Sequence, residues 1–256
     1  MRLAVAQCSH RGGRECNEDY LDFCGNESIG CFALADGTGG YRGGALAAES
    51  VVRQVLQAFS GAPKVCRETV EAALASARSA LMRERARHPE LASMNTTLAT
   101  LMVDTSQAVA YWSHLGDSRI YLFRNGRAHV LTHDHSVLQA LIDAGLVRGN
   151  PRGHVDRNTL YASVGSDETP PHAICEKPVA LRPGDVFLLC TDGFWEALDE
   201  SLMEALLLDA RLPEQWINNM VASIPRPDAR EQDNFSALAV WVGEREEVTR
   251  IQVRSR

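Results

Sequence analysis

The spacing of apolar residues changes along the chain, and this change constrains the fold more than any other sequence feature. Short apolar stretches typical of strands come first, at residues 2–8, 20–25 and 29–35. Apolar residues then recur every three or four positions over 48–59 and again over 63–88, which predicts two consecutive amphipathic helices. Because such helices must bury their apolar faces, the strands on either side of them are the available partners.

A two-residue period returns after these helices and indicates an antiparallel meander. Its expected strands are 96–104, 107–115, 119–124 and 128–132. A short helix is predicted at 136–144, and a polar stretch marked by Gly and Pro at about 145–172 is interpreted as a flap. The remaining expected elements are strands at 173–179, 185–191 and 235–242 and helices at 194–208 and 213–223.

This order of elements predicts an α+β fold. Strands and helices come in groups and do not alternate singly, so we expect a four-layer α-β-β-α sandwich of two antiparallel sheets flanked by helix pairs. No internal repeat, low-complexity tract or linker rich in Ser or Gly divides the chain. A single domain over residues 1–256, with the flap as part of it, is therefore predicted.

The charge balance and the apolar runs exclude several classes of protein. With 33 acidic and 26 basic residues the net charge is −7, which argues against affinity gained by neutralising nucleic-acid phosphates. The apolar runs at 186–190 and 237–242 are far shorter than the roughly 20 residues that span a bilayer, and no export signal is visible. We expect a cytoplasmic protein with no nucleic-acid or membrane partner, whose seven cysteines are reduced thiols.

Acidic residues stand where the predicted strands begin or end. They are Glu18, Asp19, Asp36, Asp117, Asp192 and Asp233. Each one alone is most simply explained as a turn or cap residue, because Asp-Gly is a favoured turn pair. If the strands lie side by side, however, these carboxylates converge. Their mutual repulsion would then raise their pKa values or open that end of the sheets, unless cations neutralise them.

The type of donor atom selects the cation. Carboxylate oxygens without accompanying His or Cys suit Mg²⁺ or Mn²⁺. Two such ions, about 3.5–4 Å apart, can activate a shared water and stabilise a displacement at phosphorus. Phosphate ester hydrolysis is thus the predicted chemistry. Arg14, which precedes Glu18 by four residues, is the nearest candidate to hold the phosphate, since a guanidinium grips two oxygens at once.

The chain resembles the metal-dependent protein phosphatases of type 2C, and most closely the bacterial Ser/Thr phosphatases among them. The resemblance is carried in order by eight segments: RECNED (14–19), LADGTGG (34–40), NTTLATLMV (95–103), HLGDSRIYLFRNG (114–126), LTHDHS (131–136), HVDRNTLYASVG (154–165), RPGDVFLLCTDGFWEAL (182–198) and QDNFSALAV (232–240). A single one of these motifs would be a weak signal, whereas all eight span nearly the whole chain.

The resemblance implies a role for each acidic residue. Asp36 would bridge two Mn²⁺ or Mg²⁺ ions, with the Gly37 carbonyl and Glu18 or Asp19 at one ion. Asp192 and Asp233 would hold the other ion, and Asp117 with Asp192 a weaker third one. Arg14 would bind the substrate phosphate, and Asn234 would orient Asp233 or the last strand. Asp36 and Arg14 are thus the residues expected to act most directly in catalysis.

The implied activity is hydrolysis of phosphoserine and phosphothreonine in proteins by direct attack of a metal-activated water, without a phospho-enzyme. The expected partners are phosphorylated proteins and a cognate bacterial Ser/Thr kinase in signalling, and a monomer is expected. One alternative is a catalytically silent protein of the same fold that binds phosphoproteins as a regulator. Another is a phosphatase dedicated to a signalling switch such as an anti-sigma-antagonist protein.

One position departs from the eukaryotic pattern of the family. Where those members carry a His after the Asp-Gly pair, this chain has Thr38. A threonine hydroxyl is a poor general acid near neutral pH. We expect water held by the metal, and not Thr38, to protonate the leaving oxygen.

Other polar and aromatic residues have simpler interpretations. His133 and His135 flank Asp134 before a predicted helix, which Asp134 or Ser136 would cap. His114 is interpreted as a satisfied core or edge residue. Substrate contact is an open alternative for His154 and Arg157 in the flap. The tryptophans are predicted to be core anchors and not stacking partners: Trp112, Trp195 and Trp216.

Overall fold

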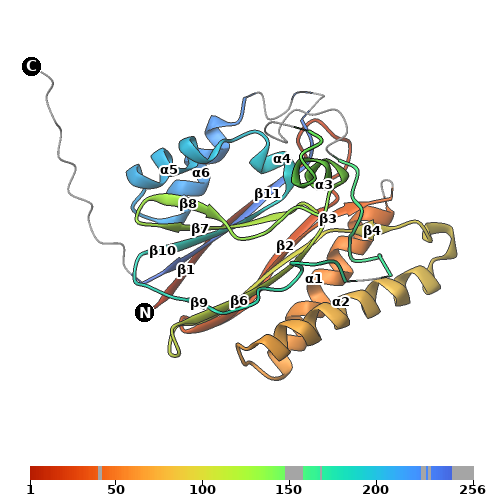
Figure 1. Cartoon of the computed structure of the whole chain (residues 1–256), viewed down its shortest axis with the longest axis horizontal. Coiled ribbons are helices and arrows are strands. Elements are labelled where there is room, and N and C mark those ends of the chain that lie inside the picture. The colour runs from red at the N-terminus through yellow and green to blue at the C-terminus, as the bar shows by residue number, and fades with distance from the viewer. Residues whose placement is uncertain (40–41, 148–157, 168, 226–228, 230–231, 244–256) are drawn as a thin grey trace, which may run out of the picture.

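Two antiparallel sheets packed face to face form the centre of the molecule (Figure 1). The structure is a computed structural model, and it describes the chain apart from residues 40–41, 148–157, 168, 226–228, 230–231 and 244–256. One sheet has the strand order β1 (Leu3–His10), β11 (Phe235–Val242), β10 (Asp185–Cys190), β7 (Arg119–Arg124), β8 (Arg127–Val130). The other has the order β2 (Asp19–Gly25), β3 (Ile29–Thr38), β5 (Leu98–Asp104), β6 (Val109–Leu115), β9 (Val179–Ala180), with β4 (Asn95–Thr96) paired to β3.

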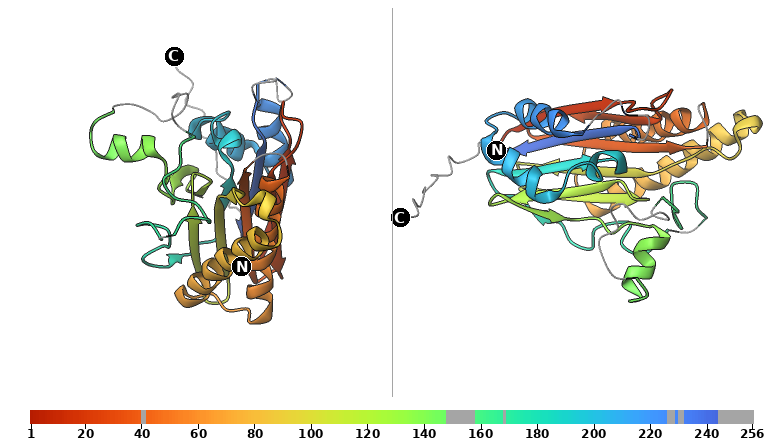
Figure 2. Two further views of the ribbon diagram at one scale, coloured as in Figure 1. Left: turned by 90° about the vertical axis from the view of Figure 1, so that its right-hand side faces the viewer. Right: turned by 90° about the horizontal axis from the view of Figure 1, so that it is seen from above.

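Helices cover the outer face of each sheet. Against the β3 sheet lie α1 (Gly43–Gly61) and α2 (Arg67–Arg87), which is followed by a 3-10 turn at Pro89–Leu91. Against the β11 sheet lie α4 (Asp192–Trp195), α5 (Glu200–Asp209) and α6 (Pro213–Ser223). Helix α3 (Val137–Asp143) stands apart from both helix layers (Figure 2). The predicted α+β sandwich with flanking helices is confirmed.

The central strands are buried on both faces, which explains their unbroken apolar sequences. In β10, Phe187 and Leu189 point into the core between the two sheets, whereas Val186 and Leu188 pack under α5 and α6. The same alternation places Leu238 and Val240 of β11 between the sheets, and their neighbours against the helices. Both sheets are therefore fixed from two sides, and the ends of their strands provide a rigid base for polar side chains.

Several predicted elements differ in extent. The helix expected at 194–208 is two helices, because Asp199 accepts a hydrogen bond from the Leu202 N–H at 2.7 Å and starts α5 afresh as its N-cap. The strand expected at 173–179 is reduced to β9 and a single bridge between Ser113 and Ile174. Helix α2 begins at Arg67 and not at residue 63. Residues 148–157 and 168 of the predicted flap lie outside the described residues.

No helix within the described part of the chain is both long and apolar enough to cross a membrane.

Gly37 is the point of closest approach between β3 and the start of α1. A Cβ atom there would collide with the carbonyl oxygen of Gly44 in the first turn of α1. We expect Gly37→Ala to lower the free energy of unfolding by about 1–3 kcal/mol, as overpacking does elsewhere. Urea denaturation followed by circular dichroism measures this change.

Gly61→Ala is the matched control. Gly61 is the last residue of α1, and a Cβ there has no neighbour within 4 Å. Alanine restricts the unfolded chain, so this variant should be stabilised by at most about 1 kcal/mol. Equal stability of the two variants would contradict the close contact between Gly37 and Gly44.

Candidate active site

The structure brings the predicted acidic residues together at one end of the two sheets. Asp19 begins β2 and lies directly opposite Asp36 of β3 in the strand register. Asp192 follows β10 at the start of α4, and Asp233 precedes β11. Asp117 lies in the turn between β6 and β7, where the chain passes from one sheet to the other. Both sheets therefore contribute carboxylates to one cluster.

Asp36 is the electrostatic centre of the cluster. Burial and repulsion from four carboxylates raise the pKa of Asp36 well above its ordinary value; these are Asp19, Asp192, Asp117 and Asp233. Burial, followed by the charge of Asp192, raises the pKa of Asp117 well above its usual range. Burial and the charge of Asp233 raise the pKa of Asp192 to about 6. Burial and mutual repulsion therefore favour the protonated forms of these carboxyl groups unless a cation lies beside them.

Two oxygen atoms at the edge of the cluster lack the partners that buried polar atoms normally have. Among the described residues, neither Glu18 Oε1 nor Asp19 Oδ1 has a hydrogen-bond partner, although both atoms are buried. Burial raises the pKa of Glu18 as well, with the charge of Asp233 as the next cause. Unpaired carboxylate oxygens among like charges match the donor set of a hard divalent cation, so the residues present fit Mg²⁺ or Mn²⁺.

Among the described residues, the acidic side chains of the cluster are not arranged around one common point. In the described parts of the chain, no three acidic, His or Cys side chains are arranged as they would be around one ion. One reason is that the carboxylates have other partners. Arg14 Nη2 lies 2.7 Å from Asp233 Oδ2, and Asp192 Oδ1 accepts a hydrogen bond from the Gly193 N–H at 2.6 Å. An ion held by Asp233 or Asp192 would compete with these contacts.

Backbone contacts fix Asp36 from the neighbouring strand. The Asp36 N–H donates to Thr97 Oγ1 at 2.9 Å, and Thr96 Oγ1 donates to the Asp36 carbonyl at 2.8 Å. Thr97 Oγ1 also lies 2.7 Å from Ser118 Oγ, next to Asp117 in the chain. These hydroxyls lie in segments that the sequence already singles out, although their support of Asp36 was not predicted.

Asn234 joins the loop that carries Arg14 and Glu18 to the last strand. Its Oδ1 accepts from the Glu18 N–H at 2.8 Å, and its Nδ2 donates to the carbonyls of Arg11 and Cys16 at 2.8 and 2.9 Å. The Asn234 N–H also donates to Asp233 Oδ1 at 2.8 Å. Asn234 thus holds the loop as well as its neighbour Asp233.

A cavity of about 240 Å³ opens over the cluster. Predicted residues that line it are Arg14, Glu18, Asp36, Gly37, Asp117, Asp192, Asp233 and Asn234. Thr38 lines it too, and so do Asn158 and Leu160 from the flap. Asp19 does not line the cavity. Its side chain is buried, and its Oδ2 accepts a hydrogen bond from Thr191 Oγ1 at 3.0 Å. His154 and Arg157, for which substrate contact was an open alternative, lie outside the described residues.

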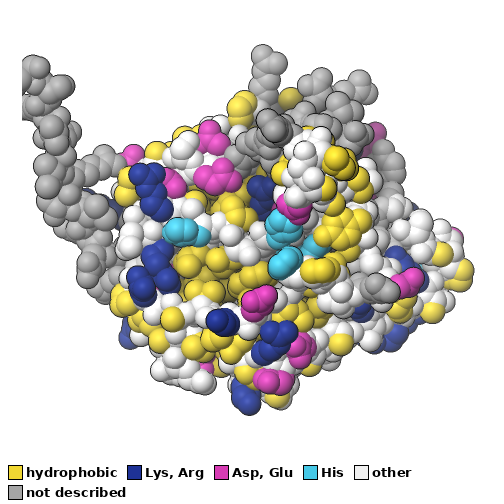
Figure 3. Space-filling model, in the orientation of Figure 1, with side chains coloured by type: hydrophobic (Ala, Val, Ile, Leu, Met, Phe, Trp, Pro, Cys, Tyr) yellow, Lys and Arg dark blue, Asp and Glu magenta, His cyan; other side chains and the backbone are white. Residues whose placement is uncertain are grey.

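The histidines near the cavity have structural partners. Ser136 caps α3 as predicted, by accepting from the Gln139 N–H. His135 is buried, accepts from the Gly116 N–H at 3.2 Å and stacks on His114 with ring centroids 4.3 Å apart. His114 is buried and contacts the His133 carbonyl through Nε2, but its Nδ1 has no partner among the described residues. Figure 3 shows histidine side chains at the surface of the face that Figure 1 presents, and these are other histidines than the buried His114 and His135.

A known protein family and several of its characterised members match the chain over most of its length. The family model described as protein phosphatase 2C matches residues 6–219. The chain is 31% identical over 191 residues to protein phosphatase PhpP of Streptococcus pneumoniae, which covers 72% of this chain and 76% of PhpP. It is 29% identical over 207 residues to the serine/threonine protein phosphatase PstP of Mycobacterium tuberculosis, which covers 80% of this chain. The match spans only 39% of the length of PstP.

Solved structures agree with these matches. The crystal structure of the Mycobacterium tuberculosis serine/threonine phosphatase PstP/Ppp superposes with a TM-score of 0.83 at 25% identity, covering 95% of this chain and 100% of that one. The catalytic domain of PstP in complex with 2 manganese ions superposes with a TM-score of 0.80 at 25% identity, covering 95% and 99%.

The raised pKa values predict how stability depends on pH without metal. A carboxyl group whose pKa is raised on folding binds more protons in the folded state, so its stabilising effect is complete below the unfolded pKa and is lost as the pH rises through the folded pKa. For Asp19, burial raises the pKa from 3.8 to about 8, which sets this window. We expect the melting temperature of the metal-free protein to fall between about pH 4 and pH 8.

Divalent metal should reverse this fall, because it neutralises the same carboxylates. Differential scanning fluorimetry with Mn²⁺ and with a chelator, across this pH range, measures the effect. The difference between the two conditions should be largest at the alkaline end. Equal melting temperatures with Mn²⁺ and with chelator at about pH 8 would contradict a metal-binding role for the cluster.

Proposed function

Because the chain belongs to the protein phosphatase 2C family, we propose that it hydrolyses phosphoserine and phosphothreonine in proteins with the help of divalent metal ions. One observation carries the proposal: carboxylates from both sheets converge on Asp36 beneath a cavity that Arg14 also lines. The names of the relatives PhpP and PstP support the substrate class. A silent regulator has no chemical need for this acidic set, so we favour the enzyme.

The proposed ligands are those that the resemblance to the protein phosphatase 2C family implies. Asp36 would bridge two ions, with Glu18 or Asp19 and the Gly37 carbonyl on one side and Asp192 and Asp233 on the other. Asp117 with Asp192 would hold a third, weaker ion. When bound, Mn²⁺ or Mg²⁺ would supply the charge that activates a water for attack on phosphorus and offsets the charge of the phosphate. The complex of the PstP catalytic domain with 2 manganese ions favours Mn²⁺.

Arg14 is proposed to bind the substrate phosphate by exchanging partners. Its side chain is 55% exposed and pairs with Asp233, which is itself proposed to be a metal ligand. With Asp233 as a metal ligand, the guanidinium would be free to donate two parallel hydrogen bonds to phosphate oxygens in the cavity that it lines. Arg14 would thereby orient the substrate and offset its negative charge.

A covalent route through cysteine has little support. Cys8 and Arg14 have the Cys-x5-Arg spacing of cysteine-dependent phosphatases. Cys8, however, lies in the middle of β1, and burial raises the pKa of its thiol to about 12. A protonated thiol is a weak nucleophile. Direct attack of water, without a phospho-enzyme, therefore remains the proposed mechanism.

The wider assignment is also part of this proposal. Residues 1–256 would form one catalytic domain, including the flap at about 145–172. The protein would act as a cytoplasmic monomer in signalling and oppose a bacterial Ser/Thr kinase on shared phosphoprotein substrates. The phosphatase names of the bacterial relatives support the phosphoprotein substrates in this assignment.

Asp192→Asn tests the metal centre. Asp192 interacts with both Asp117 and Asp233, so loss of its charge should weaken metal binding on two sides of the cluster. We expect Mn²⁺-dependent release of phosphate from p-nitrophenyl phosphate and from a phosphothreonine peptide to fall roughly 10²–10³-fold, as when a key electrostatic group is removed. Steady-state kinetics over a Mn²⁺ titration gives this value.

Asp22→Asn is the matched control, since Asp22 lies on β2 outside the cavity and contacts the Phe23 N–H. This variant should retain wild-type turnover. A folded wild-type protein without metal-dependent turnover would reject the enzyme and favour the silent regulator.

Thr38→Ala tests the source of the leaving-group proton. Thr38 lines the cavity, but its hydroxyl is a poor acid near neutral pH. We expect the variant to hydrolyse an alkyl phosphate at nearly the wild-type rate. p-Nitrophenyl phosphate is the internal control, because its leaving group needs no proton. A loss confined to the alkyl phosphate would assign the proton to Thr38.

A further inference from the structure

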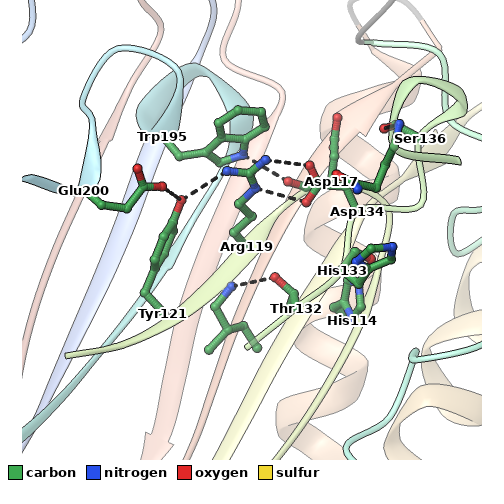
Figure 4. Close-up of polar contacts among 12 residues, drawn as sticks. His114, Asp117, Arg119, Tyr121, Thr132, His133, Asp134, Ser136, Trp195 and Glu200 are labelled. Carbon is green, nitrogen blue, oxygen red and sulfur yellow. Dashed lines mark hydrogen bonds and ion pairs between the residues drawn. The ribbon is translucent and has the colours of Figure 1, made fainter. Parts of the chain in front are cut away.

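A buried cation lies beside the active site without lining its cavity. Arg119 is the first residue of β7 and is 8% exposed. Its Nε and Nη2 donate to Asp134 Oδ1 and Oδ2 at 3.0 and 2.7 Å, which is a bidentate ion pair (Figure 4). The guanidinium carbon also lies 3.5 Å from the centre of the Trp195 ring. We call Arg119, Asp134 and Trp195 the Arg119 clamp.

Stability alone does not explain an ion pair in this place. Desolvation of two buried charges offsets most of their attraction, and apolar residues of similar size often replace such pairs without loss of stability. A bidentate pair does fix direction, however, because the planar guanidinium and the carboxylate align in one plane. The neighbours of the Arg119 clamp therefore indicate what it positions.

The first neighbour is Asp117. The Trp195 Nε1–H donates to the Asp117 carbonyl at 3.0 Å while the ring of Trp195 covers Arg119. Trp195 also ends α4, the short helix that Asp192 begins. Trp195 thus supports both Asp117, in the turn between β6 and β7, and Asp192, which follows β10. Trp195 is a buried core anchor as predicted, and its contact with Arg119 is an addition that the sequence did not predict.

The second neighbour is the described end of the flap. The residue after Asp134 is His135, whose N–H donates to the Gly116 carbonyl at 2.9 Å and whose carbonyl accepts from the Tyr161 N–H at 3.0 Å. Next to this contact, Ser136 forms a bridge with Leu160. Leu160 and Asn158 line the cavity. The segment that contains Asp134 therefore joins the Asp117 turn to the flap.

We propose that Arg119 is a positioning residue that holds Asp117 and the flap residues Asn158 and Leu160 in fixed relation to Asp192. Arg119 touches neither substrate nor metal; it acts by tying the segment at Asp134 to the start of β7 and to Trp195. The inference rests on the proposed function, since it assigns to Arg119 the alignment of the weaker metal site and of the substrate cavity.

The chain supplies a matched control on the same strand. Arg124, at the other end of β7, donates from Nε and Nη2 to Asp185 at 2.8 and 2.7 Å, and Asp185 is 1% exposed. This pair has the same chemistry, although the Arg124 side chain is 20% exposed against 10% for that of Arg119. The pair lies at the end of β7 away from the Asp117 turn and the flap. A change that follows the loss of either ion pair is therefore a general effect on the structure. A change that follows only the loss of the Arg119–Asp134 pair indicates that this pair positions the site.

The experiment compares Arg119→Met/Asp134→Leu with Arg124→Met/Asp185→Asn. Each double variant removes both charges and so leaves no unpaired buried ion. In the second variant the amide oxygen of the introduced asparagine keeps an acceptor for the Arg182 N–H, which donates to Asp185 at 2.8 Å. Mn²⁺ binding without substrate is measured from the electron paramagnetic resonance signal of free Mn²⁺. Melting temperatures are measured alongside, and KM and kcat are determined with a phosphothreonine peptide.

We expect both double variants to melt near the wild-type temperature. Only Arg119→Met/Asp134→Leu should bind its weakest Mn²⁺ roughly tenfold to a hundredfold less tightly, as when an outer-shell partner is lost, and show a raised KM for the peptide. Mn²⁺ isotherms and KM values that coincide for the two double variants would overturn the proposal. Should the test variant unfold, Arg119→Lys replaces it, because lysine keeps the charge without the bidentate geometry; wild-type Mn²⁺ binding in that variant would equally overturn the proposal.

The two proposals fail in different ways. A wild-type protein that binds Mn²⁺ but releases no phosphate would reject the phosphatase function, while the comparison of Mn²⁺ isotherms would still decide the role of Arg119. A wild-type protein that binds no Mn²⁺ would overturn both.

Discussion

Repulsion among carboxylates is the constraint on which the rest of this structure depends. Asp19 and Asp36 lie directly opposite each other on neighbouring strands, an arrangement that like charges make unfavourable. Asp117, Asp192 and Asp233 add to the same field. A flexible chain would relieve this repulsion by moving the groups apart. Here strands buried on both faces hold them together, so the core maintains a charge density that only protons or cations can neutralise.

The supports of the cluster come from different parts of the chain, and each acts on the backbone. Thr96 and Thr97 hold Asp36 from the neighbouring strand, and Asn234 holds the loop before Glu18. Trp195 holds Asp117 through its carbonyl. The carboxylates have fewer and more local contacts, such as those of Asp192 with the Gly193 N–H and of Asp233 with Arg14. An ion could replace such contacts without movement of the strands.

Sequence reasoning reached the elements and the acids because their signals are local. Apolar periodicity locates the strands and helices, and Asp36 and Asp192 are visible as acids that end apolar strands. The contacts that support the acidic residues could not be predicted in this way, because they join residues that are distant in the sequence. Arg119 and Asp134 are fifteen residues apart, and Asn234 meets Glu18 across 216. Neither spacing has a sequence signature. The break before α5 was missed for a local reason, since Asp199 interrupts an otherwise continuous helical pattern with a cap.

The pairing of β11 determines when the site can form during synthesis. β11 lies between β1 and β10, and its register with β1 runs from Leu3 opposite Val242 to His10 opposite Phe235. β1 leaves the ribosome before the other strands of its sheet but has no partner in that sheet until β11 has been made. Asp233 and Asn234 arrive with that late strand. A nascent chain therefore exposes one edge of β10 and lacks a complete acidic cluster until β11 is made. The β3 sheet, whose strands all precede β10 in the chain, can form before the site is complete.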